Sequence, residues 1–152
     1  MPRAALDVLR WQFRLAHLRL ERGLDAVAQR PELLPRASVT YARGVVREDL
    51  GVHGLLSVGG TPLALGPWHG RTGLSELPPI GGPRAWQTWS ARLVCDLAPL
   101  RVYAQAVYAA TDAALAEDTH AIACPPYTLR LLGAIVLTVA ASAAELAALV
   151  PT

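Results

Sequence analysis

The sequence of 152 residues has no lysine and no asparagine, only two cysteines, and only 17% charged side chains. Two cysteines are too few for a disulfide scaffold or a four-cysteine zinc site. Hydrophobic residues make up 53% of the chain, which excludes a disordered protein. All 14 basic residues are arginine and the formal net charge is only +2, so we expect no nucleic-acid partner. The length predicts one domain, residues 1–152.

Long hydrophobic runs are also missing. The longest uncharged apolar stretch, Leu131 to Ala144, falls short of the roughly 18 residues that a membrane span needs. The charged first 20 residues lack the apolar region of a signal peptide. We therefore expect no membrane contact and a cytoplasmic protein, in which Cys95 and Cys124 are buried, reduced and inert.

Apolar residues recur every three or four positions in four segments, which predicts an all-α fold. The predicted helices cover residues 4–29, 39–58, 97–117 and 127–149, and Ser38 is the expected N-cap of the second. The inward-facing residues are, for the first helix, Leu6, Leu9, Phe13, Ala16, Leu20, Leu24 and Val27; for the second, Ala42, Val46, Asp49, His53 and Leu56; and for the third, Leu100, Ala104, Val107, Thr111 and Leu115. Three glycines weaken the second helix by about 1 kcal/mol each, so a closely packed neighbouring helix has to compensate.

Glycine and proline fill 12 of the 25 positions from 59 to 83. A connection of this length is expected where two consecutive helices run in the same direction, because the chain must return along the full bundle. The pattern of residues 84–94 predicts a short amphipathic turn with Trp86, Trp89 and Leu93 inward. The predicted architecture is an up-down-down-up four-helix bundle with a long crossover at 59–83.

Three segments carry a resemblance to a known family. The run LRVYAQAVYAATDAALAE at Leu100–Glu117 resembles the third helix of the DinB-like (YfiT-type) superfamily. LRWQFRL at Leu9–Leu15 and AELAAL at Ala144–Leu149 resemble its first and last helices. The resemblance implies a bacterial four-helix bundle, commonly a homodimer, in a family named for DNA-damage-inducible expression and associated with stress responses.

The best understood members of that superfamily are metal-dependent enzymes that act with low-molecular-weight thiols. The resemblance implies one metal-binding histidine on the second helix and an H-x-x-x-H pair on the fourth. In this sequence Thr138 and Ser142 stand at the paired positions, and Val45 or Val46 stands at the third. None of these side chains is a useful transition-metal ligand, so we expect no metal, no cofactor and no thiol-transferase activity.

The leading hypothesis is a stress-associated binding or regulatory protein with a cavity for a small polar ligand. The expected ligand-binding residues are Val46, Asp49, His53, Thr138 and Ser142, because hydroxyl and carboxylate groups suit hydrogen bonding. One alternative is a metal-dependent thiol transferase or hydrolase with a site rebuilt on Glu48, Asp49 and His53, which His17 or water would have to complete. The other is a structural dimerisation module, with the apolar fourth helix at the interface.

The remaining polar candidates favour structural roles. His17 borders the first apolar stripe and is expected to make one hydrogen bond at the core edge. His69, with Trp68 and Arg71, forms either an anion or ring-binding set or a solvated loop with Trp68 folded onto the bundle. His120 is expected on a surface loop. The tryptophans at and after the crossover either seal the end of the bundle or roof a ligand pocket.

Overall fold

The computed structural model describes residues 2–56, 60–116 and 126–150. Regular structure in these ranges is helical, and the one β-bridge is an isolated pair between Leu74 and Cys95. The all-α prediction is therefore confirmed. The helices are α1 (Pro2–Val27), α2 (Leu34–Glu48), η1 (Asp49–Leu56), η2 (Leu63–Leu65), α3 (Pro83–Arg92), α4 (Leu97–Ala116) and α6 (Pro126–Leu149).

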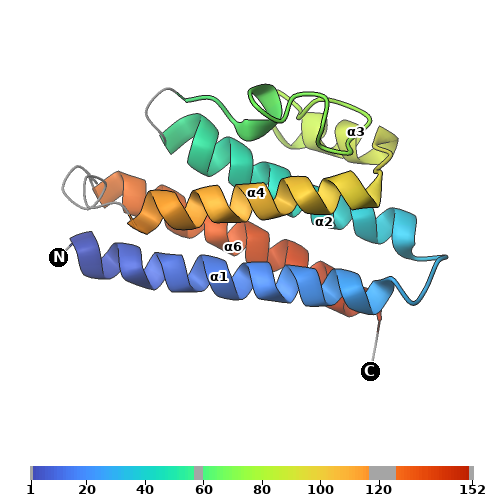
Figure 1. Cartoon of the computed structure of the whole chain (residues 1–152), viewed down its shortest axis with the longest axis horizontal. Coiled ribbons are helices and arrows are strands. Elements are labelled where there is room, and N and C mark those ends of the chain that lie inside the picture. The colour runs from blue at the N-terminus through green and yellow to red at the C-terminus, as the bar shows by residue number, and fades with distance from the viewer. Residues whose placement is uncertain (1, 57–59, 117–125, 151–152) are drawn as a thin grey trace.

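Four long helices, α1, α2, α4 and α6, lie side by side, and α3 lies with the preceding connection on the side farthest from α1 (Figure 1). The most extensive packing joins α6 to α1 and α2. Every residue of the predicted inward stripes of α1 and α4 is buried, so these two predictions are confirmed. Both helices keep an unbroken helical period, which is why the sequence located them well.

The beginning of α2 differs from the prediction. The helix begins at Leu34, not at residue 39, and Pro35 lies in its first turn. Proline is tolerated there because the first-turn N–H groups have no helical partner. Ser38 is consequently not an N-cap: its hydroxyl lies inside the helix and donates to the carbonyl oxygen of Leu34 at 2.7 Å.

After Glu48 the chain continues as a π-helix, η1, in place of the predicted α-helix. Close packing at the glycines is the expected compensation and is present: a Cβ added to Gly51 would lie 2.6 Å from Cδ1 of Ile135, and one on Gly44 would lie 3.0 Å from Cβ of Ser142. Any larger residue at Gly51 would push α6 away. The glycines therefore set the spacing between α2, η1 and α6.

Residues 60–82 form the crossover segment, which contains only the short helix η2. Its C-terminal part is tied to the connection between α3 and α4 by the Ser75 N–H, which donates to the carbonyl oxygen of Val94 at 3.0 Å. Gly73 has a φ of +78°, and a Cβ there would lie 2.4 Å from the carbonyl oxygen of Asp96. Trp89 of α3 and Leu93, which directly follows α3, are buried as predicted, whereas Trp86 is only partly buried.

Helix α6 is apolar around most of its circumference. It is the one helix in the described ranges that is long and apolar enough to cross a membrane, at a mean hydropathy of 2.0 over its most apolar window, of which 33% is buried. The core helix of a soluble protein passes the same test. Its buried side consists of Leu132, Val136, Val139, Ser142, Ala143 and Leu146.

Asp112 of α4 is the centre of one of the ionic contacts that link α1 to α4. Arg10 and Arg14 each donate two hydrogen bonds, 2.7–2.9 Å long, to the carboxylate of Asp112. The two guanidinium groups hold the pKa of Asp112 well below its usual value of 3.8. Paired bidentate contacts at a carboxylate only 28% exposed are stronger than an ordinary surface ion pair.

We expect Asp112→Asn to lower the free energy of unfolding by about 1–2 kcal/mol near neutral pH, because both bidentate contacts are lost. A depressed folded-state pKa stabilises the native state above pH 3.8, and that contribution is lost as the pH falls below this value. The difference from wild type in urea unfolding should therefore shrink in acid. Asp7→Asn is the matched control, since Asp7 is 56% exposed and pairs only within α1, with Arg3; an equal loss in both variants would contradict this account.

Candidate functional site

Two consecutive carboxylates lie in the core where α2 becomes η1. Glu48 and Asp49 are both 0% exposed. A buried carboxylate is costly unless hydrogen bonds compensate its lost hydration. Their partners therefore decide whether this place is structural or chemical.

Glu48 lies within a chain of hydrogen-bonded side chains from four helices, α1, α2, η1 and α4. His17 of α1 meets Glu48 through Nε2 and Oε1 at 2.7 Å. The Thr111 hydroxyl of α4 donates to Oε2 at 2.7 Å. Since a hydroxyl has one proton, the Nε2 of His53, 3.1 Å from the Thr111 oxygen, is the donor in that contact. Burial of His53 lowers its pKa, which keeps the ring neutral near pH 7.

Asp49 makes a separate set of contacts with the crossover segment. Its carboxylate accepts the N–H of Leu63 at 2.7 Å, the N–H of Ala64 at 2.9 Å and the Tyr103 hydroxyl at 2.6 Å. Burial and the nearby carboxylate raise the pKa of Tyr103 far above its ordinary value, so the hydroxyl stays a donor. Asp49 thereby ties η2 to η1 and α4.

A second, partly buried group of side chains surrounds Glu21 of α1. Its carboxylate accepts the hydroxyls of Tyr41 and Tyr108, and the guanidinium of Arg101 at 3.0 Å. The Tyr108 ring stacks on His17 with centroids 3.9 Å apart. The polar side chains of α1, α2 and α4 thus form one packed, hydrogen-bonded core layer.

The hydrogen bonds of this polar layer link the helices to one another, which indicates a structural role. In the described part of the chain, no three His, Cys, Asp or Glu side chains are grouped in a way that could hold a metal ion. The alternative metal site was predicted on Glu48, Asp49 and His53. Glu48 and His53 both contact the Thr111 hydroxyl, whereas the Asp49 carboxylate accepts hydrogen bonds from the crossover segment. The expected single hydrogen bond of His17 goes to Glu48.

A different place has the form of a binding site. A groove of ≈ 590 Å³ lies between the end of α2, η1 and α6, with α3 and the crossover segment on its other side. We call this cavity the groove. Its lining consists of Arg47, Leu50, Gly51, Gly54, Leu55, Gly60, Pro62, Pro79, Ile80, Gly81, Trp86, Leu131, Ala134, Ile135 and Thr138. Apolar side chains dominate it.

Arg47 is the one charged side chain among the described residues that line the groove. Its guanidinium lies 4.2 Å from the centre of the Trp86 ring. Among the described residues, no carboxylate lies within ion-pair distance of Arg47. Burial lowers the pKa of Arg47, and the neighbouring Arg43 lowers it further. The groove therefore presents a partly desolvated cation without a counter-ion.

The structure distributes the predicted ligand-binding residues over several places. Thr138 lines the groove and donates to the carbonyl oxygen of Ala134 at 3.0 Å. Val46, like Val45, is 0% exposed in the core, and Ser142 packs against Gly44. Asp49 and His53 belong to the buried polar layer. Of the five, only Thr138 reaches the groove.

Sequence reasoning missed Arg47 and Ile80 as groove residues. Arg47 lies next to the predicted inward position Val46, and nothing in the helical period marks it as facing a pocket. The tryptophans at and after the crossover carried a usable signal, because Trp86 does line the groove while Trp89 packs edge-on against it at 5.4 Å. Trp86 thus forms part of the groove wall, and Trp89 is buried in the hydrophobic core.

The other polar and aromatic residues considered from the sequence have surroundings that fit structural roles. Trp68 is half-buried against Tyr103, with Arg71 stacked on it at 4.8 Å, and His69 is exposed. Cys95 is partly buried, and burial raises its pKa to about 11, which keeps the thiol protonated and unreactive. His120 and Cys124 lie outside the described residues.

Comparison with family models, with curated proteins and with solved structures finds no match to this chain.

We expect Asp49→Ala to lower the free energy of unfolding by about 3 kcal/mol or more, because three buried donors lose their acceptor together. Tyr103→Phe removes only one of the three bonds and should cost about 1 kcal/mol. Urea unfolding measures both, and amide hydrogen exchange at Leu63 and Ala64 should accelerate in Asp49→Ala alone. Equal losses in the two variants would show that Asp49 does not hold the crossover segment.

Proposed function

We propose that this protein binds a small molecule with an apolar body and one anionic group in the groove, as a binding or regulatory protein without metal-dependent catalysis. The observation that carries the proposal is Arg47: a partly buried guanidinium, stacked on Trp86, without a carboxylate partner among the described residues. An anionic ligand would supply the missing counter-charge.

The size and chemistry of the groove support the same ligand. Its volume of ≈ 590 Å³ falls in the range of about 300–1,000 Å³ typical of small-molecule sites. Three large apolar side chains of the lining are unusually exposed: Leu55 at 80%, Ile80 at 97% and Leu131 at 42%. An apolar ligand body would remove this surface from water, which is favourable by about 25 cal/mol per Å².

The anionic group is best described as planar. The fork of a guanidinium matches a carboxylate in two parallel hydrogen bonds. Trp86 lies 4.2 Å from the centre of the Arg47 guanidinium on one side, and no described carboxylate occupies its donors. Thr138 adds a hydroxyl on the α6 side, whose oxygen retains acceptor capacity beside its bond to Ala134.

We further propose that the chain has the up-down-down-up bundle topology of the DinB-like superfamily and is cytoplasmic. Four long helices, with the crossover segment between α2 and α4, support this topology. The groove lies between α2 and α6, the two helices that the resemblance gives as the metal-binding pair, and Thr138 lines it where that family has a histidine. None of the described lining residues is His, Cys, Asp or Glu, which favours binding over the thiol-transferase alternative. A stress-associated role rests on the resemblance alone.

Two fluorescent probes that share one aromatic body test the groove. We expect 8-anilinonaphthalene-1-sulfonate, an anion, to bind, and Arg47→Gln to weaken it about tenfold, the effect of losing one charge-assisted contact. N-phenyl-1-naphthylamine lacks the sulfonate and should bind both proteins equally. Decanoate, which has a carboxylate, should displace both probes.

The groove itself is tested by filling it. Ala134→Phe should abolish binding of both probes while circular dichroism and the urea midpoint stay close to wild type, because Ala134 is exposed on α6. If the anionic probe binds Arg47→Gln as tightly as wild type, or if Ala134→Phe leaves both affinities unchanged, the proposed ligand site is wrong.

We also propose a homodimer formed by the outer face of α6. Leu137 is 71% exposed, and alanines occupy the exposed positions 141, 144 and 148 on the same side of the helix. Small side chains between larger apolar ones let a second helix approach closely, and an exposed apolar face of this kind is typical of an interaction surface.

Sedimentation measures the oligomer directly. We expect Leu137→Arg to convert a dimer to a monomer, because it places an unpaired charge in an apolar interface. Trp11→Arg on α1 is the matched control, since Trp11 is 63% exposed and lies on another helix. A wild-type monomer, or a dimer unaffected by Leu137→Arg, would remove both this proposal and the alternative of a structural dimerisation module.

A further inference from the structure

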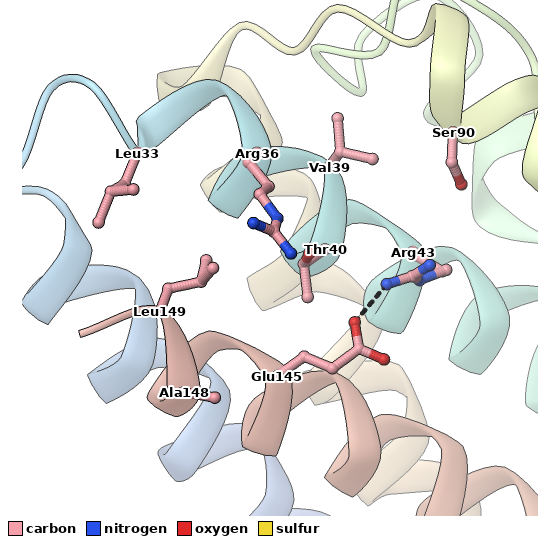
Figure 2. A pocket seen from close by; sticks show the side chains of 9 residues that line it. All are labelled: Leu33, Arg36, Val39, Thr40, Arg43, Ser90, Glu145, Ala148 and Leu149. Atoms are coloured by element: carbon pink, nitrogen blue, oxygen red, sulfur yellow. Dashed lines mark hydrogen bonds and ion pairs between the residues drawn. The ribbon is translucent and has the colours of Figure 1, made fainter. Parts of the chain in front are cut away.

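A second cavity lies at the other end of the furrow between α2 and α6. It has a volume of ≈ 760 Å³ and is lined by Leu33, Arg36, Val39, Thr40, Arg43, Ser90, Glu145, Ala148 and Leu149. Figure 2 shows Arg36, Thr40 and Arg43 along α2, Glu145 on α6 and Ser90 on α3. We call it the α2–α3–α6 pocket. It shares no residue with the groove.

Two arginines give the pocket its charge. Arg36 and Arg43 lie two helical turns apart on α2, and both line the cavity. Arg43 pairs with Glu145 at 2.5 Å, as the dashed line in Figure 2 shows. Arg36 has no ion-pair partner within the described ranges. One carboxylate thus faces two guanidinium groups, and the lining has an excess positive charge.

Thr40 provides an unused buried donor between the two arginines. Its side chain belongs to a residue only 7% exposed, and its hydroxyl makes no hydrogen bond to any described residue. This is unusual for a helix, where a hydroxyl can bond the carbonyl four residues earlier. Ser38 and Thr138 of this chain do so. The Thr40 hydroxyl is free to donate to a bound molecule.

Ser90 adds a second unused hydroxyl from α3. Its Oγ is buried and has no hydrogen-bond partner in the described structure. Buried polar atoms normally have a partner, and this hydroxyl would gain one by turning toward a molecule in the cavity. Arg36, Thr40 and Ser90 together are three donor groups that approach one cavity from two helices.

From this arrangement we infer that the α2–α3–α6 pocket binds a phosphate monoester. Arg36 can only donate, and the two hydroxyls can donate or accept, so an anionic occupant rich in acceptors satisfies all three groups. The three terminal oxygens of a phosphate monoester point in tetrahedral directions, which suits groups that approach from two helices better than the single plane of a carboxylate does. Leu33, Val39 and Leu149 give an apolar wall for the organic part. Glu145 competes with the phosphate for Arg43.

Phenyl phosphate is the probe, measured by isothermal titration calorimetry on the full chain. We expect millimolar or tighter binding, and weaker binding of benzoate, which has the same ring and a carboxylate. Thr40→Val and Arg36→Gln should each weaken phenyl phosphate about tenfold, the value of a hydrogen bond to a charged group. Thr40→Ser keeps the hydroxyl and should bind as wild type does. Glu145→Gln should bind several-fold more tightly, because it removes a negative charge beside the phosphate.

Matched controls separate this site from the rest of the surface and from the groove. Arg71→Gln removes an exposed arginine in the crossover segment and should leave phenyl phosphate binding unchanged. Arg47→Gln should weaken the sulfonate probe of the groove and leave the effect of Thr40→Val intact, so the two sites fail independently. Circular dichroism and urea midpoints confirm that each variant is folded.

The inference is overturned by any of three results. The first is no heat with phenyl phosphate at millimolar concentration. The second is benzoate binding as tightly as phenyl phosphate. The third is a folded Thr40→Val that binds like wild type, or a folded Arg71→Gln that is as impaired as Arg36→Gln, because phosphate would then be attracted by surface charge alone.

Discussion

The hydrogen bonding of two adjacent buried carboxylates governs the arrangement of the rest of the molecule. Glu48 and Asp49 are fully buried, and neither is compensated by an arginine. Glu48 takes its bonds from α1 and α4, and Asp49 takes its bonds from η2 and α4. Because an unsatisfied buried carboxylate is so costly, these partners must lie where they do, and α1, α4 and the crossover segment are positioned around α2.

The change from α-helix to π-helix follows directly after Glu48 and shapes both faces of the chain there. On the inner face, the wider turn directs Asp49 to η2 and His53 to Thr111. On the outer face, Gly51 and Gly54 lower the floor of the groove beneath Ile135 and Pro62. One irregular segment therefore satisfies the buried polar layer and opens the cavity beside Arg47, in keeping with the frequent occurrence of π-helical turns at functional sites.

The sequence was informative where a regular period persisted and uninformative where it broke. The stripes of α1 and α4 were predicted residue by residue, because seven and five apolar or small residues repeat without interruption. The predicted start at residue 39 missed the first turn of α2, although Pro35 fits a first helical turn well. The π-helix leaves no mark in the pattern, so Asp49 and His53 were expected to share a face as an i, i+4 pair. The groove was unpredictable because Arg47, Ile80 and Thr138 come from three segments whose relative placement depends on the crossover segment.

The contacts of Asp49 also bear on the order in which the chain folds. Its bonds to Leu63 and Ala64 span only 14 and 15 residues, whereas its bond to Tyr103 spans 54. Closing the short loop costs little chain entropy, and the entropy cost grows only slowly with loop length. The first half of the crossover segment can thus dock on η1 before α4 arrives, and the late arrival of Tyr103 then seals a turn that has already formed. Nucleation near the middle of the chain, rather than at either terminus, is the folding route that this geometry favours.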